Sequence, residues 1–357
     1  MIASRVASSV VQRQVNYVTP VPQGSARGLV ETVYAQVAQE MQLVVPPAQL
    51  HSPSPEVLAA YWMVMREPLL PTENVDRATK EAVAAAVSVA NICPYCVDMH
   101  SVGLYELSTE HDAEAIVADR LTDIADRNIR EAAEWGRTAH QPQTSRPVLP
   151  FPERGRAELV GVVVGFHYIA RVVNVFLANF LLPPGLTPRA RRRLKRGIGW
   201  LLQGTLRDAR EPGRSVELLP PAPLPAEAAW AAGSPHVAGA MARAYAAFEA
   251  AGERAVPPAV RELVAERLDV WRGEETGLSR QWCERLIAPL PEAERAAGRL
   301  ALLTAFASYQ VDEEVVAEFR RHRPGDAALV DAVAWASFAA ARRVGAWYVP
   351  AGSPEPV

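Results

Sequence analysis

Helical spacing of apolar residues recurs along almost the whole chain, and it constrains the fold more than any other feature of the sequence. It begins near Leu29 with LVETVYAQVAQEM and continues at 55–67, 76–92, 95–107, 112–140, 156–182, 236–250, 257–272, 278–288, 291–308, 312–321 and 326–347. No run shows the convincing alternation of apolar and polar residues that marks a half-buried strand. We therefore predict an all-α fold.

The length of the chain favours two domains. With 357 residues, 49% of them apolar, it exceeds what a single hydrophobic core usually holds. The composition becomes rich in Pro and Arg between Pro183 and Pro235, where we expect a linker with one helix around 198–207. The predicted divisions are an N-terminal arm (1–27), a first domain (28–183), the linker (184–235) and a second domain (236–350).

The two predicted domains resemble each other in sequence. A shift of 181 residues pairs VDRATKEAV at 75–83 with VPPAVRELV at 256–264, so that Glu81 falls on Glu262. A rival register, shifted by 214, pairs CPYCVDMH with ASYQVDEE. In the preferred register Glu274 and Gly277 replace two cysteines of the first copy. We interpret the chain as a duplicated helical unit in which the first copy keeps a functional site and the second copy is degenerate.

Charge and cysteine content exclude several classes of function. A net charge of -3 and a pI near 6.2 give no overall attraction to nucleic acid or to an anionic membrane. The basic run Arg189–Arg196 is interpreted as a solvated helix face. Three cysteines do not make a secreted disulfide framework, and no signal-peptide pattern follows Met1, so a cytoplasmic protein is expected.

One segment, Leu159–Leu182, is long and apolar enough to cross a bilayer. Its interior carries Arg171, which costs at least ~2.5 kcal/mol at mid-span. We predict a buried helix of a soluble bundle. On this helix, His167 and Arg171 are expected to be a satisfied core histidine and a member of a structural ion pair, with the mouth of an active site as the alternative.

The residues that carry chemistry lie in KEAVAAAVSVANICPYCVDMHS, residues 80–101. A helix carrying Glu81 is predicted to end near Asn91, and a second to begin with Pro94 at its first position. Cys93 and Cys96 then lie in or beside a first helical turn. There the positive end of the macrodipole favours thiolate over thiol.

The spacing of this segment also predicts a proton relay. Cys96 and His100 are four residues apart and share a helical face, and Glu81 meets His100 if the two helices pack as neighbours. We assign Cys96 as the attacking thiolate because the histidine lies one turn beyond it. Cys93, three residues away, is assigned as the resolving thiol.

Three other interpretations compete with this one. CPYC is also the dithiol of glutaredoxins, but there it follows a strand, whereas here an alanine-rich helical run precedes it. A metal site would have CxxC and His100 as three ligands, but Cys283 lies far along the chain and there is no second CxxC. A pair of inert buried cysteines leaves the accompanying His and Glu unexplained.

The pattern of Glu, Cys, Cys and His at these offsets resembles the alkyl hydroperoxide reductase D-like group of the carboxymuconolactone decarboxylase superfamily. The resemblance covers about 30–183 and, more weakly, 236–348. It implies two tandem alkylhydroperoxidase D-like helical bundles, a peroxidatic Cys96, a resolving Cys93 and a Glu81–His100 proton relay. It also implies a hydroperoxide substrate, no bound cofactor, and recycling by an external dithiol partner of lipoyl or thioredoxin type.

The chain departs from that family at Tyr95, where the best-known peroxidases have a histidine. Tyr95 is expected either to donate a hydrogen bond to the peroxide or to pack. Family members are usually trimers or hexamers, so a homo-oligomer is expected in which the tandem chain replaces one subunit contact. The alternative functions are a general thiol-disulfide oxidoreductase and a non-catalytic redox sensor.

The remaining candidates are interpreted as structural. Trp62, Met63 and Met65 are expected to be core residues and not a substrate box. Cys283 is expected to be an inert packed thiol. The other histidines, including His140 and His236, show no partner pattern.

Overall fold

The computed structural model describes residues 14–141, 149–177, 181–182 and 185–350. Within these ranges the regular elements are helical, and an isolated bridge between Val15 and Leu177 is the β-type contact they make. The predicted all-α fold is confirmed.

The helices follow the predicted order closely. Those of the first half are α2 (Gly28–Met41), α3 (Pro46–His51), α4 (Pro55–Leu69), α5 (Arg77–Ala90), α6 (Pro94–Leu107), α7 (Glu110–Val117), α8 (Arg127–Thr138) and α9 (Arg156–Phe176). They are followed by α10 (Pro188–Arg207), α11 (Pro235–Ala255), α12 (Pro258–Val270), α13 (Gln281–Ile287), α14 (Glu292–Ala307), α15 (Glu313–His322) and α16 (Asp326–Ala346).

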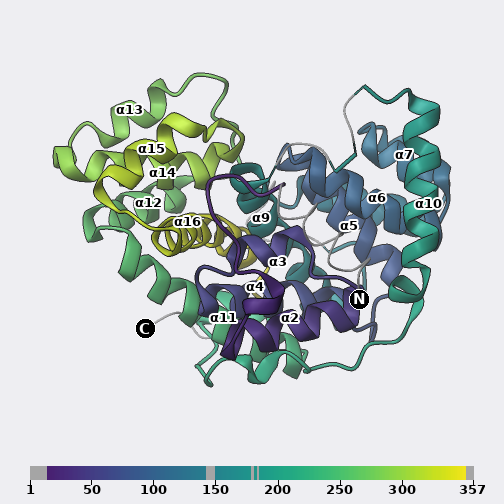
Figure 1. Cartoon of the computed structure of the whole chain (residues 1–357). Coiled ribbons are helices and arrows are strands. Elements are labelled where there is room, and N and C mark those ends of the chain that lie inside the picture. Colours follow the sequence, from purple (N-terminus) through teal and green to yellow (C-terminus); the bar gives the residue numbers. More distant parts are fainter. Residues whose placement is uncertain (1–13, 142–148, 178–180, 183–184, 351–357) are drawn as a thin grey trace.

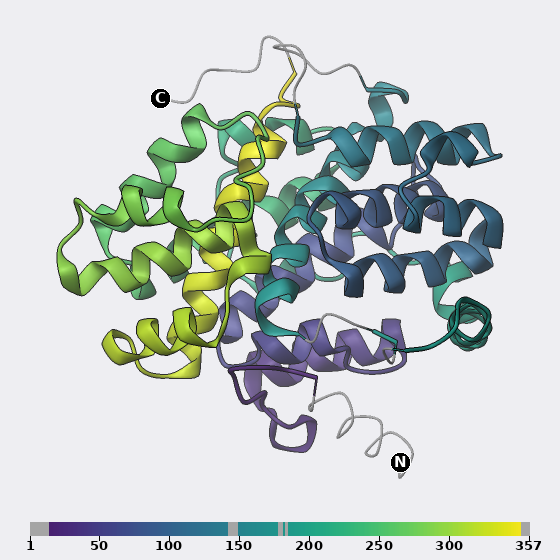
Figure 2. The same ribbon diagram turned by 90° about the horizontal axis from the view of Figure 1, so that it is seen from above.

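Two groups of helices flank a shared centre (Figure 1). Helices α5 to α8 lie on one side and α12 to α15 on the other, and the view from above shows the same division (Figure 2). Between them α9 packs along α16 and α4 along α11. The hydrophobic core is therefore continuous across the two halves.

Helix α9 belongs to the stretch Glu153–Phe176, which has a mean hydropathy of 1.8 and is long enough to span a membrane. However, 94% of its most apolar window is buried inside the protein. A lipid-facing helix would leave that surface uncovered. The burial is that of a core helix, as the sequence predicted.

The helix predicted at 112–140 is interrupted. Helix α7 ends at Val117, and Asp119 then adopts a left-handed conformation with φ 52°. The Asp112 carboxylate accepts hydrogen bonds from the Ala125 and Asp126 amides, and Asp126 in turn caps α8. These aspartates satisfy backbone donors that a continuous helix would have paired internally.

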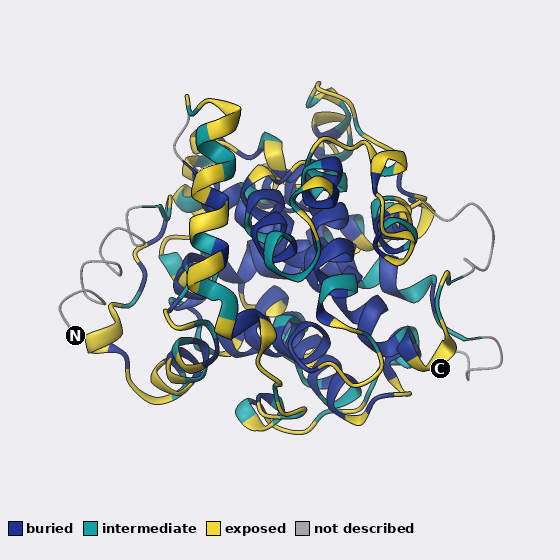
Figure 3. Ribbon diagram, turned by 90° about the vertical axis from the view of Figure 1, so that its right-hand side faces the viewer, coloured by how far each residue is buried: buried dark blue, intermediate teal, exposed yellow. Residues whose placement is uncertain are grey.

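The segment predicted as a linker contains a longer helix than expected, because α10 begins at Pro188 and not near Ile198. It packs against α6, and its far side is exposed to solvent (Figure 3). The interpretation of its basic run as a solvated face is wrong in part. Lys195 is fully buried and pairs with Asp98 and Glu114, while Arg196 pairs with Glu110.

Helix positions agree with the 181-residue shift at two places. Shifted in this way, α4 covers 236–250, where α11 spans Pro235–Ala255, and α5 covers 258–271, where α12 spans Pro258–Val270. The shifted equivalents of the catalytic candidates are not gathered into a site. Glu262 is exposed on α12, and Glu274 and Gly277 are exposed in the irregular stretch that follows it.

Candidate active site

Helix α5 brings a carboxylate into the core. Asp76 caps its first turn by accepting from the Thr79 amide at 2.9 Å. The alanines and valines of Ala82–Val87 have no exposed surface, so neighbouring helices approach closely. Glu81 stands at the start of this apolar run and is 2% exposed. A carboxylate at such a depth needs partners that compensate its lost hydration.

A tight turn connects α5 to the dithiol. The chain leaves the helix at Asn91, and Ile92 adopts a left-handed conformation with φ 51°. Cys93 occupies the N-cap of α6 with Pro94 at its first position, as predicted. Both thiols are free and buried, with Cys93 1% and Cys96 4% exposed.

The predicted meeting of Glu81 and His100 occurs. His100 Nδ1 lies 2.6 Å from Glu81 Oε2, and Arg77 Nε donates to Glu81 Oε1 at 2.7 Å. Burial alone would raise the pKa of Glu81, but the charges of Arg77 and His100 lower it to about 2. Glu81 is therefore a carboxylate at any neutral pH, and it fixes His100 as a donor through Nδ1.

Gly103 on α6 leaves the space that the Glu81 side chain occupies. A Cβ at this position would lie 3.2 Å from the Glu81 carboxyl carbon. Phe166 on α9 completes the surroundings, with its ring edge-on to that of His100 at a centroid distance of 4.4 Å. The imidazole orientation is thus set by packing as well as by the carboxylate.

The expectation that Cys96 is a ready thiolate is wrong for the reduced, unliganded protein. Hydrogen bonding with Cys93, together with burial, raises the pKa of Cys96 well above its usual value. In the described structure no hydrogen bond joins His100 to Cys96, although catalytic hydrogen bonds often form only when substrate is bound. Removing the Cys96 proton therefore requires a base.

An apolar cavity of about 90 Å³ lies over Cys96. Cys96, His100 and Tyr95 contribute to its wall. The rest of the wall is made largely of apolar side chains: Met41, Val45, Pro47, Tyr61, Trp62, Met65, Leu69, Leu70, Met99 and Ile169. Trp62 and Met63 belong to the hydrophobic core, as predicted, and Met65 packs against it. Trp62 and Met65 also line this cavity, whereas Met63 does not.

Tyr95 presents an unused polar group to this region. It is 3% exposed, and its hydroxyl makes no hydrogen bond in the described structure. Burial raises its pKa well above the usual range, so the hydroxyl keeps its proton. A protonated, buried hydroxyl without a partner can donate to a ligand oxygen.

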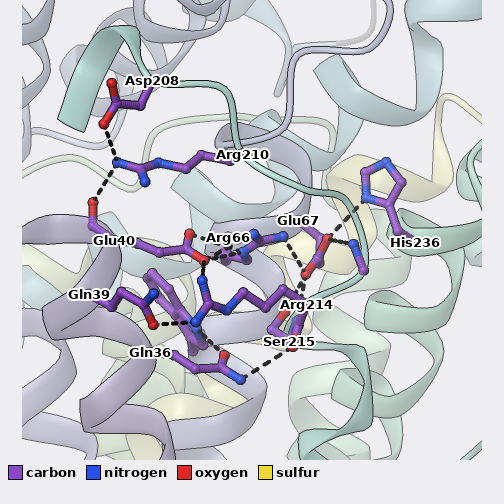
Figure 4. Close-up of polar contacts among 12 residues, drawn as sticks. Gln36, Gln39, Glu40, Arg66, Glu67, Asp208, Arg210, Arg214, Ser215 and His236 are labelled. Atoms are coloured by element: carbon purple, nitrogen blue, oxygen red, sulfur yellow. Dashed lines mark hydrogen bonds and ion pairs between the residues drawn. The ribbon is translucent and has the colours of Figure 1, made fainter. Parts of the chain in front are cut away.

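Two arginines of this region were missed from the sequence. Arg77 lies four residues before Glu81, a helical spacing that could have indicated the pair. Arg66 lines the cavity, but its guanidinium is turned to Glu40 and Glu67 at 3.0 Å each, within the buried network of Figure 4. Because those carboxylates neutralise it, the cavity stays apolar in character.

The polar residues of helix α9 differ from what the sequence predicted. Arg171 is buried but makes no ion pair among the described residues; it donates to the backbone of Ala305 and to the side chain of Asn91. His167 is buried, and its Nε2 has no partner in the described structure. Neither residue lines the cavity over Cys96. The prediction that Arg171 forms a structural ion pair is therefore wrong, and so is the alternative that these two residues lie at the mouth of the active site.

Comparison with known proteins agrees with this geometry. The model of the carboxymuconolactone decarboxylase family matches residues 55–138, which run from α4 to α8 and include the whole Glu81–His100 constellation. The chain is 39% identical over 333 residues to a protein named alkyl hydroperoxide reductase Rv2159c from Mycobacterium tuberculosis (strain ATCC 25618 / H37Rv). That alignment covers 93% of this chain and 94% of the relative, so both halves are shared.

Proposed function

The chain belongs to the carboxymuconolactone decarboxylase family, and from this we propose that it is a peroxidase that reduces alkyl hydroperoxides through Cys96 and Cys93. One observation carries the proposal. The free thiol of Cys96 and a histidine held by a buried carboxylate line one apolar cavity, and the second free thiol, Cys93, lies three residues before Cys96. Each group has a role in peroxide reduction.

The first step is removal of the Cys96 proton. Its raised pKa means that thiolate has to be made at the moment of reaction. His100 is the base, and Nε2 is the atom available because Nδ1 is bound to Glu81. The Glu81 carboxylate stabilises the imidazolium that forms.

The thiolate then attacks the terminal oxygen of the hydroperoxide and the O–O bond breaks. The leaving alkoxide takes the proton from the His100 imidazolium and departs as an alcohol, while Cys96 becomes a sulfenic acid. Tyr95 donates a hydrogen bond to a peroxide oxygen during this step. The Cys93 thiol next attacks the sulfenic sulfur, so that water leaves and the Cys93–Cys96 disulfide forms.

The cavity favours an organic hydroperoxide over hydrogen peroxide. Its lining is mostly methionine, aromatic and aliphatic side chains, whose contact with an alkyl group contributes about 25 cal/mol per Å² of apolar surface removed from water. Hydrogen peroxide has no such surface. The alkyl group therefore supplies binding energy, and the polar groups at the wall orient the O–O bond.

Recycling needs an external dithiol that reaches buried sulfurs. Because Cys93 and Cys96 are at most 4% exposed, a narrow lipoyl-type arm fits this access better than the flat surface of a thioredoxin-type protein. Two thiol-disulfide exchanges with that dithiol restore both thiols.

The deciding experiment measures consumption of a small organic hydroperoxide by the full chain with dihydrolipoamide. Cys96→Ser should abolish turnover. Cys283→Ser is the matched control, because Cys283 is equally buried but lies outside the cavity, and it should retain turnover. Full activity in Cys96→Ser would contradict the proposal. Insulin reduction by the wild type without peroxide turnover would indicate a general thiol-disulfide oxidoreductase instead.

A further inference from the structure

A second cavity, of about 60 Å³, lies at the seam between the two halves of the chain. It shares no lining residue with the cavity over Cys96. The first half contributes Asn91, His140 and Arg171 to its wall, and the second half contributes Thr276 and Ser308. The side chains that face it carry an unusual excess of unused hydrogen-bond donors.

Arg171 brings a buried positive charge to this cavity. It is 6% exposed, and burial lowers its pKa to about 10 without any carboxylate to oppose the effect. Its Nε donates to the Ala305 carbonyl, and its Nη1 to Asn91 Oδ1 and the His167 carbonyl. These acceptors are all neutral, so the guanidinium has no anionic partner among the described residues. A buried guanidinium left in this way normally requires an anion.

His140 adds a second donor. It is 7% exposed, and burial lowers its pKa to about 4, so the ring is neutral. The Gln141 side-chain amide lies 3.3 Å from Nε2 and is placed to donate to it, which puts the ring proton on Nδ1. That Nδ1 is buried and has no partner in the described structure.

The second half supplies hydroxyls to the same space. The Thr276 hydroxyl is buried and has no partner among the described residues. The Ser308 hydroxyl accepts from Asn174 at 3.1 Å, which leaves its own proton for a ligand. Guanidinium, imidazole N–H and hydroxyl donors from separate elements therefore surround one cavity.

The loop that carries Thr276 is fixed against His140. Gly273 has φ +89°, and a Cβ there would lie 1.8 Å from the His140 carbonyl oxygen, so the close approach of the halves depends on this glycine. The carboxylates that line the cavity, Glu274 and Glu275, belong to exposed residues, and neither forms an ion pair with Arg171 among the described residues. Glu274 Oε2 instead accepts a hydrogen bond from the Arg272 amide at 2.8 Å.

From this arrangement we propose that the seam cavity binds a small oxyanion, a phosphate or a carboxylate group, between Arg171, His140 and Thr276. The ligand would neutralise the buried guanidinium and accept from the unused donors. The inference does not depend on the peroxidase proposal. It also assigns a role to the second half, which supplies part of a binding site beside the turn that leads to Cys93.

The test titrates the full chain with inorganic phosphate and, separately, with acetate, using sodium chloride at equal ionic strength as the control. Isothermal calorimetry and the thermal unfolding midpoint are the readouts. One of the two oxyanions should bind saturably and raise the midpoint beyond the chloride control. Whichever of phosphate and acetate binds more strongly shows whether the cavity prefers a phosphate group or a carboxylate group.

Arg171→Met should abolish this binding, so that the oxyanion no longer raises the midpoint beyond the chloride control. Should that variant fail to fold, Thr276→Val is the second test. It removes one unused hydroxyl at nearly constant volume and should weaken binding by roughly tenfold, as expected for a hydrogen bond to a charged group. Absence of binding to the wild type, or equal binding by the variants, would overturn the proposal.

Discussion

Glu81 and His100 join the two helices of the dithiol motif through a contact of 2.6 Å between Glu81 Oε2 and His100 Nδ1. The contact is buried on the carboxylate side and reinforced by Arg77 on the same helix. Because it fixes which nitrogen of His100 carries the proton, it leaves the other nitrogen free to accept one. In the proposed mechanism this pair positions His100 as the base that deprotonates Cys96, whose pKa is raised.

Replacing the Glu81 carboxylate should show whether it acts on the His100 imidazole without affecting the binding of the hydroperoxide. In Glu81→Gln the side-chain size is kept, but the negative charge that stabilises the His100 imidazolium is lost. We expect kcat for an alkyl hydroperoxide to fall by roughly 10²-fold or more, with KM little changed. Steady-state kinetics with dihydrolipoamide across pH 6 to 9 would measure this.

The matched control for this variant is Glu134→Gln, which removes an exposed carboxylate from α8. It should leave kcat and its pH profile unchanged. Wild-type kinetics in a folded Glu81→Gln protein would rule out the relay and reduce the pair to a structural role.

The buried network around Glu67 predicts a dependence of stability on pH (Figure 4). His236 Nδ1 lies 3.1 Å from Glu67 Oε2 and its Nε2 lies 2.9 Å from Glu73 Oε2. Burial alone would lower the pKa of His236, but the two carboxylates raise it above its usual value. A group with a raised folded-state pKa stabilises the protein below its unfolded pKa, and that contribution is lost as pH rises through the folded value.

We therefore expect the wild type to lose stability as pH rises above about 6.5, the unfolded pKa of histidine. His236→Gln should lack this slope, whereas His322→Gln, at an exposed position, should keep it. Urea denaturation midpoints at pH 6, 7 and 8 provide the measurement. Parallel curves for wild type and His236→Gln would show that the ion pairs do not contribute in this range.

The sequence predicted the helices and the contact between Glu81 and His100 because both depend on short-range spacing. The offsets between Glu81, the cysteines and His100 translate directly into helical faces, and Pro94 marks the start of α6. What it could not predict are contacts between elements far apart in the chain. Trp62 and Met65 on α4 line the same cavity as Cys96 on α6. Arg171 and Thr276, more than one hundred positions apart in the chain, line the seam cavity together.

The sequence also could not predict the pKa shift of Cys96 or the hydrogen-bond partners of Arg171. The start of a helix indicated a stabilised thiolate at Cys96, but its burial beside Cys93 reverses the direction of the pKa shift. Likewise Arg171 on an apolar helix indicated an ion pair, whereas the folded chain brings backbone and amide oxygens to it and no carboxylate among the described residues. Both outcomes depend on tertiary desolvation, which a spacing pattern does not encode.

The turn before the dithiol stores local strain that a substitution should relieve. Ile92 has φ 51° and is 52% exposed, and left-handed backbone is unfavourable for a β-branched residue. Ile92→Asn should raise the free energy of unfolding by about 1 kcal/mol, since Asn tolerates this conformation and little packing is lost. Urea unfolding measures the change, with Val270→Asn, at a similarly exposed position on α12, as a control that should gain nothing.

Filling the cavity over Cys96 should discriminate between substrates by size. Met65 lines it without touching the relay, so Met65→Trp reduces the space for an alkyl group while leaving Cys96, His100 and Glu81 in place. We expect KM for a bulky hydroperoxide such as cumene hydroperoxide to rise by roughly tenfold, the effect of losing about 1.4 kcal/mol of apolar contact. Turnover of hydrogen peroxide should change little, because it needs no apolar space. Met63→Leu, in the core outside the cavity, is the control, and an equal loss with both peroxides would show that the cavity does not hold the alkyl group.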